Sequence, residues 1–400
     1  MQVARRAPAR PFHHLYCLFG ALLAIALTGC ATPQRSAEVE PFDQAVVRAT
    51  DALLGQARGL VQAGSARVIV ADPSIDASSG QQSAGTQRMD RTVAARIAAT
   101  GDGMQVQPFQ AANLSRADFL LAGTLAREEA GVRINLALVD LKDGRIAAQT
   151  SALARKDEVD MTPLAYYRDS PVLLRDEAVE GLVRTSSGAR GTRADAGYLA
   201  RISTATVVND ATLLYNAGRY REALVLYRRA AAAPGGDQIR VLNGIYLTTF
   251  KLGQTAEAEE AFGRVVAFGI ANRQLGVKFL FNPGSTEFWS DPKVTNAYRL
   301  WLRQIARQGT GARVCMEVVG HSSRTGTEEI NDSLSLRRAQ YIRQRLVAES
   351  PGLADRTKAS GLGSRQNLVG TGTDDVVDAL DRRVEFGIVE CGTLPGGGKS

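Results

Sequence analysis

The 400-residue sequence predicts a multidomain α+β protein. Three observations support this class. Residues near the N-terminus alternate between helical and strand periodicity, and the last third of the chain does the same. Between them, two helix–glycine–helix patterns recur, with Gly218 and Gly253 35 residues apart. We therefore expect an N-terminal α/β layer domain, short helical hairpins, and a C-terminal βαβαββ mixed sheet.

The first 29 residues have the pattern of a targeting segment. Arg5, Arg6 and Arg10 precede an apolar run, Leu15 to Leu27, which is shorter than the ~20 residues that a membrane span needs. The run ends in Leu-Thr-Gly-Cys at 27–30, which resembles a bacterial lipobox. The resemblance implies a lipoprotein signal peptide over 1–29, lipidation of Cys30 and a tether over 30–40. The alternative is an ordinary secretory signal with a chance cysteine.

Charge does not point to a nucleic-acid partner. The formal net charge is +7, and removal of the three signal arginines leaves about +4, which is mild for this length. A secreted chain also does not meet nucleic acid. By resemblance to lipoproteins, Ala31 in place of Asp favours the outer membrane, so we expect a lipid-anchored protein on its periplasmic face.

Residues 41–167 are expected to form an α+β interaction domain. Apolar residues at helical spacing predict two helices, and β-branched or alternating runs predict strands at 67–71, 104–108, 119–127, 132–138 and 145–153. The run at 132–138 alternates, so we expect a half-buried strand, and Asp143-Gly144 predicts a type I′ hairpin turn. Pro108 should end its strand or place it at an edge. The motif VIVADPSID at 68–76 resembles the α/β domains of LpoB, FlgO and CsgG-type lipoproteins, which implies a protein-interaction module; a structural spacer is the alternative.

The middle of the chain is predicted to be helical. We expect a helix and linker over 168–197, because TSSGARGTRADAG at 185–197 is small and polar. Residues 198–272 resemble tetratricopeptide repeats through the matching segments AGRYREA at 217–223 and LGQTAEA at 252–258. Glycine at each inter-helix turn permits a positive φ. Such repeats imply a protein or peptide partner, with domain spacing as the alternative.

Residues 275–392 carry the predicted mixed sheet, followed by a flexible tail over 393–400. We expect strands at 277–281, 313–319, 358–363 and 384–388, and a helix that starts at Asp291-Pro292. A second helix should bury a stripe formed by Leu336, Ala339, Ile342 and Leu346.

The sequence GHSSRTGTEEINDSLSLRRAQYIRQRLV at 320–347, with DRRVEF at 381–386, resembles the OmpA-like peptidoglycan-binding domain. The resemblance implies that this domain binds the peptidoglycan stem peptide at its diaminopimelate residue. Arg338, expected near the start of a helix, would pair with the carboxylate. Asn331 and Leu334 match the family's helix and pocket positions, and His321 and Gly320 shape the loop. The family loop reads G-H-x-D, so Ser323 replaces an aspartate; weakened wall binding, altered preference and a different ligand all remain open.

Two cysteines remain in the mature chain after Cys17 leaves with the signal and Cys30 is lipidated. Cys315 and Cys391 lie on two strands that would be antiparallel neighbours, so we hypothesise a disulfide, with two free thiols as the alternative.

An enzyme is not expected. His321 is the one histidine after the signal, which leaves little material for a His-centred triad or a multi-His metal site, and the sequence indicates no cofactor. The pattern favours an outer-membrane lipoprotein that binds peptidoglycan non-covalently and tethers membrane to wall. The alternative is a periplasmic scaffold or regulator of an envelope machine whose last domain serves only for localisation or binds another ligand.

Overall fold

The computed structural model describes residues 39–60, 66–100, 103–273, 275–282, 284–289, 295–368, 372, 378 and 381–393. The expected signal peptide, Cys30, most of the tether, the Asp291-Pro292 helix start and residues 394–400 lie outside the described residues. Within the described ranges, no helix combines the length and apolar character that a membrane span requires.

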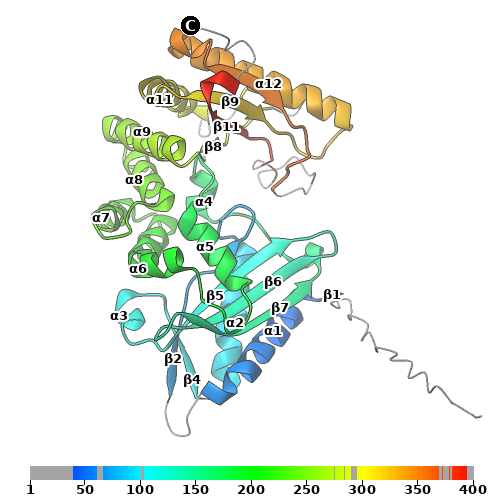
Figure 1. The fold of residues 1–400 in the computed structure, drawn as a ribbon, viewed down its shortest axis with the longest axis vertical. Coiled ribbons are helices and arrows are strands. Elements are labelled where there is room, and N and C mark those ends of the chain that lie inside the picture. The colour runs from blue at the N-terminus through cyan, green and yellow to red at the C-terminus, as the bar shows by residue number, and fades with distance from the viewer. Residues whose placement is uncertain are drawn as a thin grey trace, which may run out of the picture. The chain divides into compact units, whose positions relative to one another are not determined.

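The N-terminal half is built on a seven-stranded sheet (Figure 1). Its strand order is β1-β7-β6-β5-β2-β4, with β3 paired to β5. Strands β5, β6 and β7 form an antiparallel meander, whereas β2 is parallel to both β4 and β5. Strand β4 is an edge strand that ends just before Pro108, as predicted. The strand bounds are β1 Val39–Glu40, β2 Arg67–Ala71, β3 Ile75–Asp76, β4 Met104–Gln107, β5 Phe119–Arg127, β6 Val132–Asp140 and β7 Arg145–Ala154.

Helices pack on both faces of this sheet. Helices α1 (Phe42–Ala57) and α2 (Ala84–Thr100) share one apolar core with it, and α5 (Glu177–Ser186) and α6 (Ala196–Asn216) share a second. The expectation of a half-buried β6 is therefore wrong, because α5 covers the face that alternation assigned to solvent. The short helices are η1 Arg58–Leu60, α3 Ala111–Leu114, η2 Lys156–Glu158 and α4 Ala165–Asp169.

The turn between β6 and β7 differs from the predicted type I′ turn. Only Gly144 has a positive φ, of 70°, and the turn spans the four residues between Asp140 and Arg145. Asp140 accepts hydrogen bonds from the backbone of Lys142 and Gly144. The aspartate thus fixes a longer turn in which one glycine takes the left-handed conformation.

The stretch for which a linker was expected runs along β7. The backbone N–H groups of Gly191 and Ala194 donate to the carbonyls of Ile146 and Gly144, and Ile146 N–H donates to Thr192. Small residues permit this approach, since a Cβ on Gly188 would lie 2.5 Å from the Ile146 side chain. The small residues that suggested a linker therefore allow this segment to pack closely against β7.

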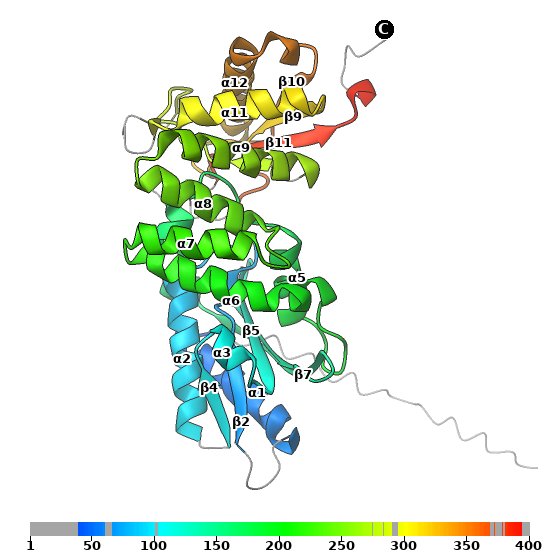
Figure 2. The same cartoon turned by 90° about the vertical axis from the view of Figure 1, so that its left-hand side faces the viewer.

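Four helices follow as two antiparallel hairpins, stacked in Figure 2: α6, α7 (Tyr220–Ala231), α8 (Ile239–Lys251) and α9 (Thr255–Ala271). Gly218 and Gly253 have φ values of 74° and 72°, as the inter-helix turns were predicted to require. The stack continues into the C-terminal third, where α9 packs against α11 (Tyr298–Gly311).

The C-terminal third has the predicted βαβαββ order in one four-stranded sheet, β10-β9-β11-β8. Strands β9 and β10 are parallel, and β11 is antiparallel to both β9 and β8. The first strand is shorter and earlier than expected. The bounds are β8 Leu275–Val277, β9 Cys315–Gly320, α12 Glu328–Glu349, η3 Pro351–Leu353, β10 Thr357–Gly361, β11 Val384–Val389 and η5 Cys391–Thr393.

The buried stripe of α12 differs at one position from the prediction. Ala339, Ile342 and Leu346 are fully buried, but Leu336 is 36% exposed. Ser335 continues the stripe instead, since it precedes Ala339 by four residues and is fully buried. Leu336 is the next residue, so its side chain points about 100° away from that of Ser335 around the helix and leaves the buried stripe.

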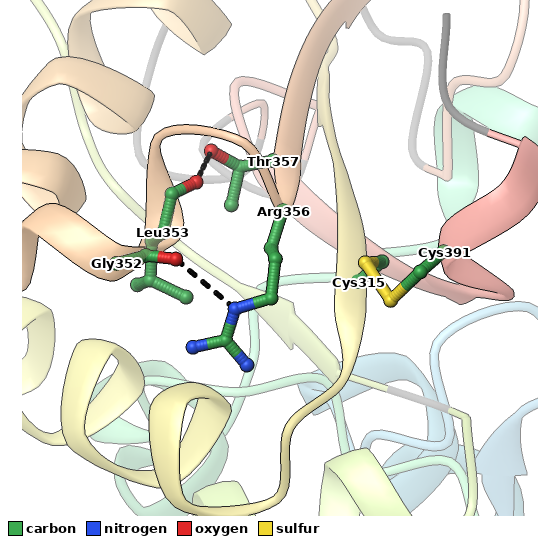
Figure 3. Close-up of a disulfide and its surroundings, with 6 residues drawn as sticks. All are labelled: Cys315, Gly352, Leu353, Arg356, Thr357 and Cys391. Carbon is green, nitrogen blue, oxygen red and sulfur yellow. Dashed lines mark hydrogen bonds between the residues drawn. A yellow bond between two sulfur atoms is a disulfide. The ribbon is translucent and has the colours of Figure 1, made fainter. Parts of the chain in front are cut away.

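The predicted disulfide between Cys315 and Cys391 is present (Figure 3). Its physical basis is the antiparallel pairing of β9 with β11, in which Cys315 lies opposite Val389. Beside it, Arg356 and Thr357 donate hydrogen bonds to the carbonyls of Gly352 and Leu353, which closes the turn from η3 into β10.

Backbone contacts join the segment after α4 to the C-terminal sheet. Val172 bridges Val277 at the edge strand, Leu173 N–H donates to Gly276, and Lys278 N–H donates to Pro171. Asp176 then accepts hydrogen bonds from the N-terminal amides of both α5 and α8. These contacts tie the N-terminal sheet, the helical hairpins and the C-terminal sheet to each other.

Candidate functional site

Three segments meet at the carboxyl end of β9. They are the loop 321–327, the loop 362–368 after β10, and residues 381–383 before β11. His321 N–H donates to the carbonyl of Arg383, Ser322 N–H to Gly363, and Leu362 N–H to Gly320. The backbone hydrogen bonding of the sheet thereby continues into these loops. The candidate site is built on these paired backbone segments.

Glycines let α12 lie close against these paired segments. Gly320 and Gly361 are register partners in β9 and β10. A Cβ on Gly361 would lie 2.5 Å from the backbone nitrogen of Leu336, and Gly320 is equally crowded by the α12 backbone. The expected role of Gly320 in backbone geometry therefore has a steric cause rather than a positive φ.

Helix α12 starts earlier than expected and places Arg338 in its middle. The Thr327 side chain caps the helix by accepting a hydrogen bond from Ile330 N–H, so α12 begins at Glu328. Arg338 is the eleventh of its 22 residues, not a residue near its start. The sequence signal for this start is the threonine followed by two glutamates, which favour a helix N-terminus.

Arg338 is 2% exposed, and its contacts fix the plane of its guanidinium group. Its Nε donates to the carbonyl of Ser285 at 3.1 Å, and its Nη2 donates to that of Asn282 at 3.2 Å. The guanidinium lies 5.0 Å from the centre of the Phe281 ring. These contacts hold the cation in one orientation, which is the condition for bidentate recognition of a carboxylate.

Ser323 stands beside a second hydroxyl. Its Oγ lies 2.9 Å from Oγ1 of Thr325, and Ser323 is 4% exposed. The two hydroxyls can accept or donate hydrogen bonds but carry no charge. The loop therefore offers neutral hydrogen bonding at the position where an acid was expected from the resemblance.

His321 and Ser322 are almost completely buried, each at 1% exposure. Within the described ranges, neither imidazole nitrogen of His321 nor Ser322 Oγ has a hydrogen-bond partner. Burial, followed by the charge of Arg383, lowers the pKa of His321 to about 4, although Glu385 opposes this with its Oε2 atom 3.8 Å from Nε2. The imidazole is therefore neutral at neutral pH.

Asn331, Leu334 and Ser335 lie on the buried face of the first half of α12. Ser335 Oγ accepts a hydrogen bond from Gly363 N–H at 2.9 Å and donates to the carbonyl of Asp332. The serine of the L-S-x-x-R-A motif thus joins α12 to the loop 362–368.

Sequence reasoning missed Asp381 and Arg383 as residues of this site. Both are buried, and Asp381 accepts from Leu368 N–H at 2.7 Å and from the Asn367 side chain at 3.2 Å. Arg383 donates to Glu385 at 2.6 Å and to the Gln366 carbonyl at 3.2 Å. Their signal was the motif DRRVEF, which the sequence analysis used for the family resemblance without assigning its residues a role in the site.

The arrangement fits recognition better than group transfer. A guanidinium such as that of Arg338 can bind an anion and hydroxyls such as those of Ser323 and Thr325 can bind polar groups, whereas the buried imidazole of His321 has a pKa far below that of a general base at neutral pH. Within the described part of the chain, no cluster of three His, Cys, Asp or Glu residues could hold a metal ion.

A known protein family matches part of the C-terminal third of the chain. Residues 280–379 match the model of the OmpA family. No curated protein matches the chain.

Three solved structures are similar to this chain, each over 28–29% of its length. The peptidoglycan-associated lipoprotein from Burkholderia pseudomallei shares 24% identity, with a TM-score of 0.24, over 28% of this chain and 89% of that one. An outer membrane protein from Borrelia burgdorferi B31 shares 24% identity, with a TM-score of 0.23, over 29% of this chain and 88% of that one. The periplasmic domain of Helicobacter pylori MotB (residues 90–256) shares 18% identity, with a TM-score of 0.24, over 29% of this chain and 72% of that one.

Proposed function

We propose that this protein is a lipid-anchored outer-membrane lipoprotein that binds peptidoglycan through its OmpA-like domain and tethers the membrane to the wall without enzymatic activity. The ligand is the stem peptide at diaminopimelate. The match of residues 280–379 to the OmpA family supports the ligand class. The lipobox-like Leu-Thr-Gly-Cys at 27–30 supports the anchor.

The observation that carries the proposal is the fixed guanidinium of Arg338. It is held by two backbone carbonyls and by the Phe281 ring, so its orientation is set before a ligand arrives. Preorganisation lowers the entropy cost of binding a carboxylate. Gly320, His321, Asn331 and Leu334 shape the surrounding loop and helix, and Ser323 with Thr325 supplies hydrogen bonds to the ligand's polar groups.

Co-sedimentation of the lipid-free mature protein with purified sacculi tests wall binding. Arg338→Ala should move most of the protein from the pellet to the supernatant. Arg337→Ala is the matched control, because Arg337 precedes it on α12 but is exposed. Equal pellet fractions for the two variants would remove Arg338 from the binding role.

Ser323→Asp tests the departure from the family loop. A hydrogen bond to a charged group is worth about 1 kcal/mol more than a neutral one, so the added carboxylate should raise affinity for the zwitterionic diaminopimelate by roughly 5-fold. Unchanged or weaker binding would show that this loop selects a different ligand.

Metabolic labelling with a radioactive fatty acid tests the anchor. Wild-type protein should carry label and fractionate with the outer membrane, whereas Cys30→Ser should carry none. A labelled Cys30→Ser variant would exclude Cys30 as the modified residue.

A scaffold or regulator of an envelope machine is the second candidate function. The contacts that tie the three parts of the chain together favour it, because Val172, Leu173 and Lys278 join the N-terminal half to the C-terminal sheet. A pull-down from envelope extract with the full mature protein tests this alternative. Specific recovery of an envelope complex by both wild type and Arg338→Ala would favour the scaffold over the tether.

A further inference from the structure

The loop 362–368, which forms one wall of the candidate site, contacts the N-terminal half of the chain. The hydroxyl of Ser78 lies 3.2 Å from the carbonyl oxygen of Leu368. Leu368 in turn donates its N–H to Asp381 at 2.7 Å. One hydroxyl from the N-terminal half thus reaches the last residue of a segment that borders the site of the proposed function.

The loop 362–368 is held to every other segment of the site. It pairs with loop 321–327 through Ser322 N–H and the Gly363 carbonyl, and Arg383 donates to Gln366. Arg365 forms ion pairs with Glu328 and Asp332 in the first turns of α12. A displacement of this loop therefore changes the position of both the Ser323 loop and the helix that carries Arg338.

Ser78 lies on a rigid turn, which lets it fix the loop rather than follow it. The buried carboxylate of Asp76 accepts from the backbone N–H groups of Ser78 and Ser79 at 2.7 and 3.1 Å. Gly80 closes the turn with a φ of 70° and donates to the Asp76 carbonyl. Arg175 donates to the Ser78 carbonyl at 2.9 Å. The turn is therefore held by its own hydrogen bonds to Asp76 and by the hydrogen bond from Arg175.

The single hydroxyl proton of Ser78 has two acceptors. Asp76 Oδ1 lies within hydrogen-bond distance of Ser78 Oγ, as does the Leu368 carbonyl. A carboxylate is the stronger acceptor, so Asp76 competes with Leu368 for this proton. An asparagine at 76 would still accept the two backbone N–H groups, since both residue types form this turn, but would compete less.

We propose that Ser78 is a positioning residue of the peptidoglycan site: its hydroxyl fixes loop 362–368 at Leu368 and couples the N-terminal half of the chain to ligand binding. The proposal rests on the proposed function for its ligand, but not for the loop contact itself. It also gives the N-terminal half a role in the affinity of the C-terminal site.

Hydrogen exchange of the full mature protein tests the contact without any ligand. Ser78→Ala should raise exchange at the amides of 363–368 roughly 3- to 10-fold, the range expected for one net hydrogen bond. Ser78→Thr keeps the hydroxyl and should restore protection, and Asp76→Asn should not lower it. Ser187→Ala is the matched control, because among the described residues its hydroxyl bonds only to Val183, at the end of its own helix.

Binding of a muramyl tripeptide that ends in diaminopimelate, measured by calorimetry on the same proteins, tests the coupling. Ser78→Ala should weaken binding by roughly the same factor, and Ser78→Thr and Ser187→Ala should bind as wild type. Unchanged exchange at 363–368 in Ser78→Ala overturns the positioning role, and raised exchange with unchanged affinity overturns the coupling. If wild type fails to bind the tripeptide, the proposed function fails and the exchange data alone decide whether Ser78 fixes the loop.

Discussion

A Cβ on Gly320 would lie 2.0 Å from the carbonyl oxygen of Ser335, so the end of β9 and the middle of α12 are in backbone contact. No side chain fits between them. This contact sets the distance between the loop that carries Ser323 and the helix that carries Arg338, and it explains why a residue of the loop motif must be glycine.

Gly320→Ala should therefore destabilise the C-terminal domain. The added methyl group must push α12 away from the sheet, at a cost of about 1–3 kcal/mol in the free energy of unfolding measured by urea denaturation. Gly311→Ala at the end of α11 is the control, because a Cβ there meets nothing within 4 Å, and it should be neutral or slightly stabilising. Equal stability of the two variants would mean that the close approach does not exist in solution.

The disulfide between Cys315 and Cys391 should contribute substantially to stability. It closes a separation of 76 residues, and the chain-entropy relation gives about 4 kcal/mol for a loop of this length. The double variant Cys315→Ala/Cys391→Ser should lower the midpoint of thermal unfolding, and reductant should lower that of wild type but not of the variant. Two titratable thiols in the denatured, non-reduced mature protein would contradict the bond.

The strands and the disulfide could be predicted from the sequence because local signals determine them. The run at 67–71 is followed by Asp72, the run at 119–127 is preceded by Asp118, and both folded as predicted. The disulfide also required the expected antiparallel pairing of the two strands, which brings Cys315 opposite Val389; Cys391 itself follows β11 in η5 and does not lie on the strand.

Errors arose where tertiary contacts override the local pattern. Burial on both faces of β6 depends on α5, which is 37 residues or more further along the chain. Leu336 looked like a core residue by type, but the fully buried Ser335 occupies the stripe because it bonds Gly363. The sequence could identify Arg338 as a ligand candidate by motif, but not Asn282 and Ser285, whose carbonyls orient it.

Two desolvated carboxylates, those of Asp72 and Asp90, should make the N-terminal half less stable as pH rises. Burial raises the pKa of Asp90 to about 7 and that of Asp72 to about 6. The folded chain then holds protons that the unfolded chain has released above pH 3.8, so the contribution of these two groups to stability is highest near pH 4 and falls until about pH 7.

Asp90→Asn isolates this effect. An asparagine can still accept from Ser74 N–H, which Asp90 does at 3.1 Å, but it cannot ionise. The variant should gain roughly 2–4 kcal/mol of unfolding free energy relative to wild type at pH 7 and little at pH 4, measured by urea denaturation. An equal difference at both pH values would contradict the raised pKa.

His321 should remain neutral down to about pH 4. Its burial lowers the pKa from 6.5, so its contribution to stability has the opposite sign: it is fully present above pH 6.5 and is lost as pH falls towards 4. In the mature chain His321 is the only histidine, which makes its imidazole proton signals in an NMR pH titration unambiguous. A midpoint near 6.5 would show that the ring is open to water.

The most direct test of peptidoglycan recognition is calorimetric titration of the mature protein with a muramyl tripeptide that ends in diaminopimelate. Wild type should show saturable binding, and Arg337→Lys should bind equally well. Arg338→Lys keeps the charge but loses the planar pair of donors, so its affinity should fall at least ~10-fold at a temperature where circular dichroism shows the variant still folded. Absent binding in wild type, or equal affinity of the two lysine variants, would contradict the account.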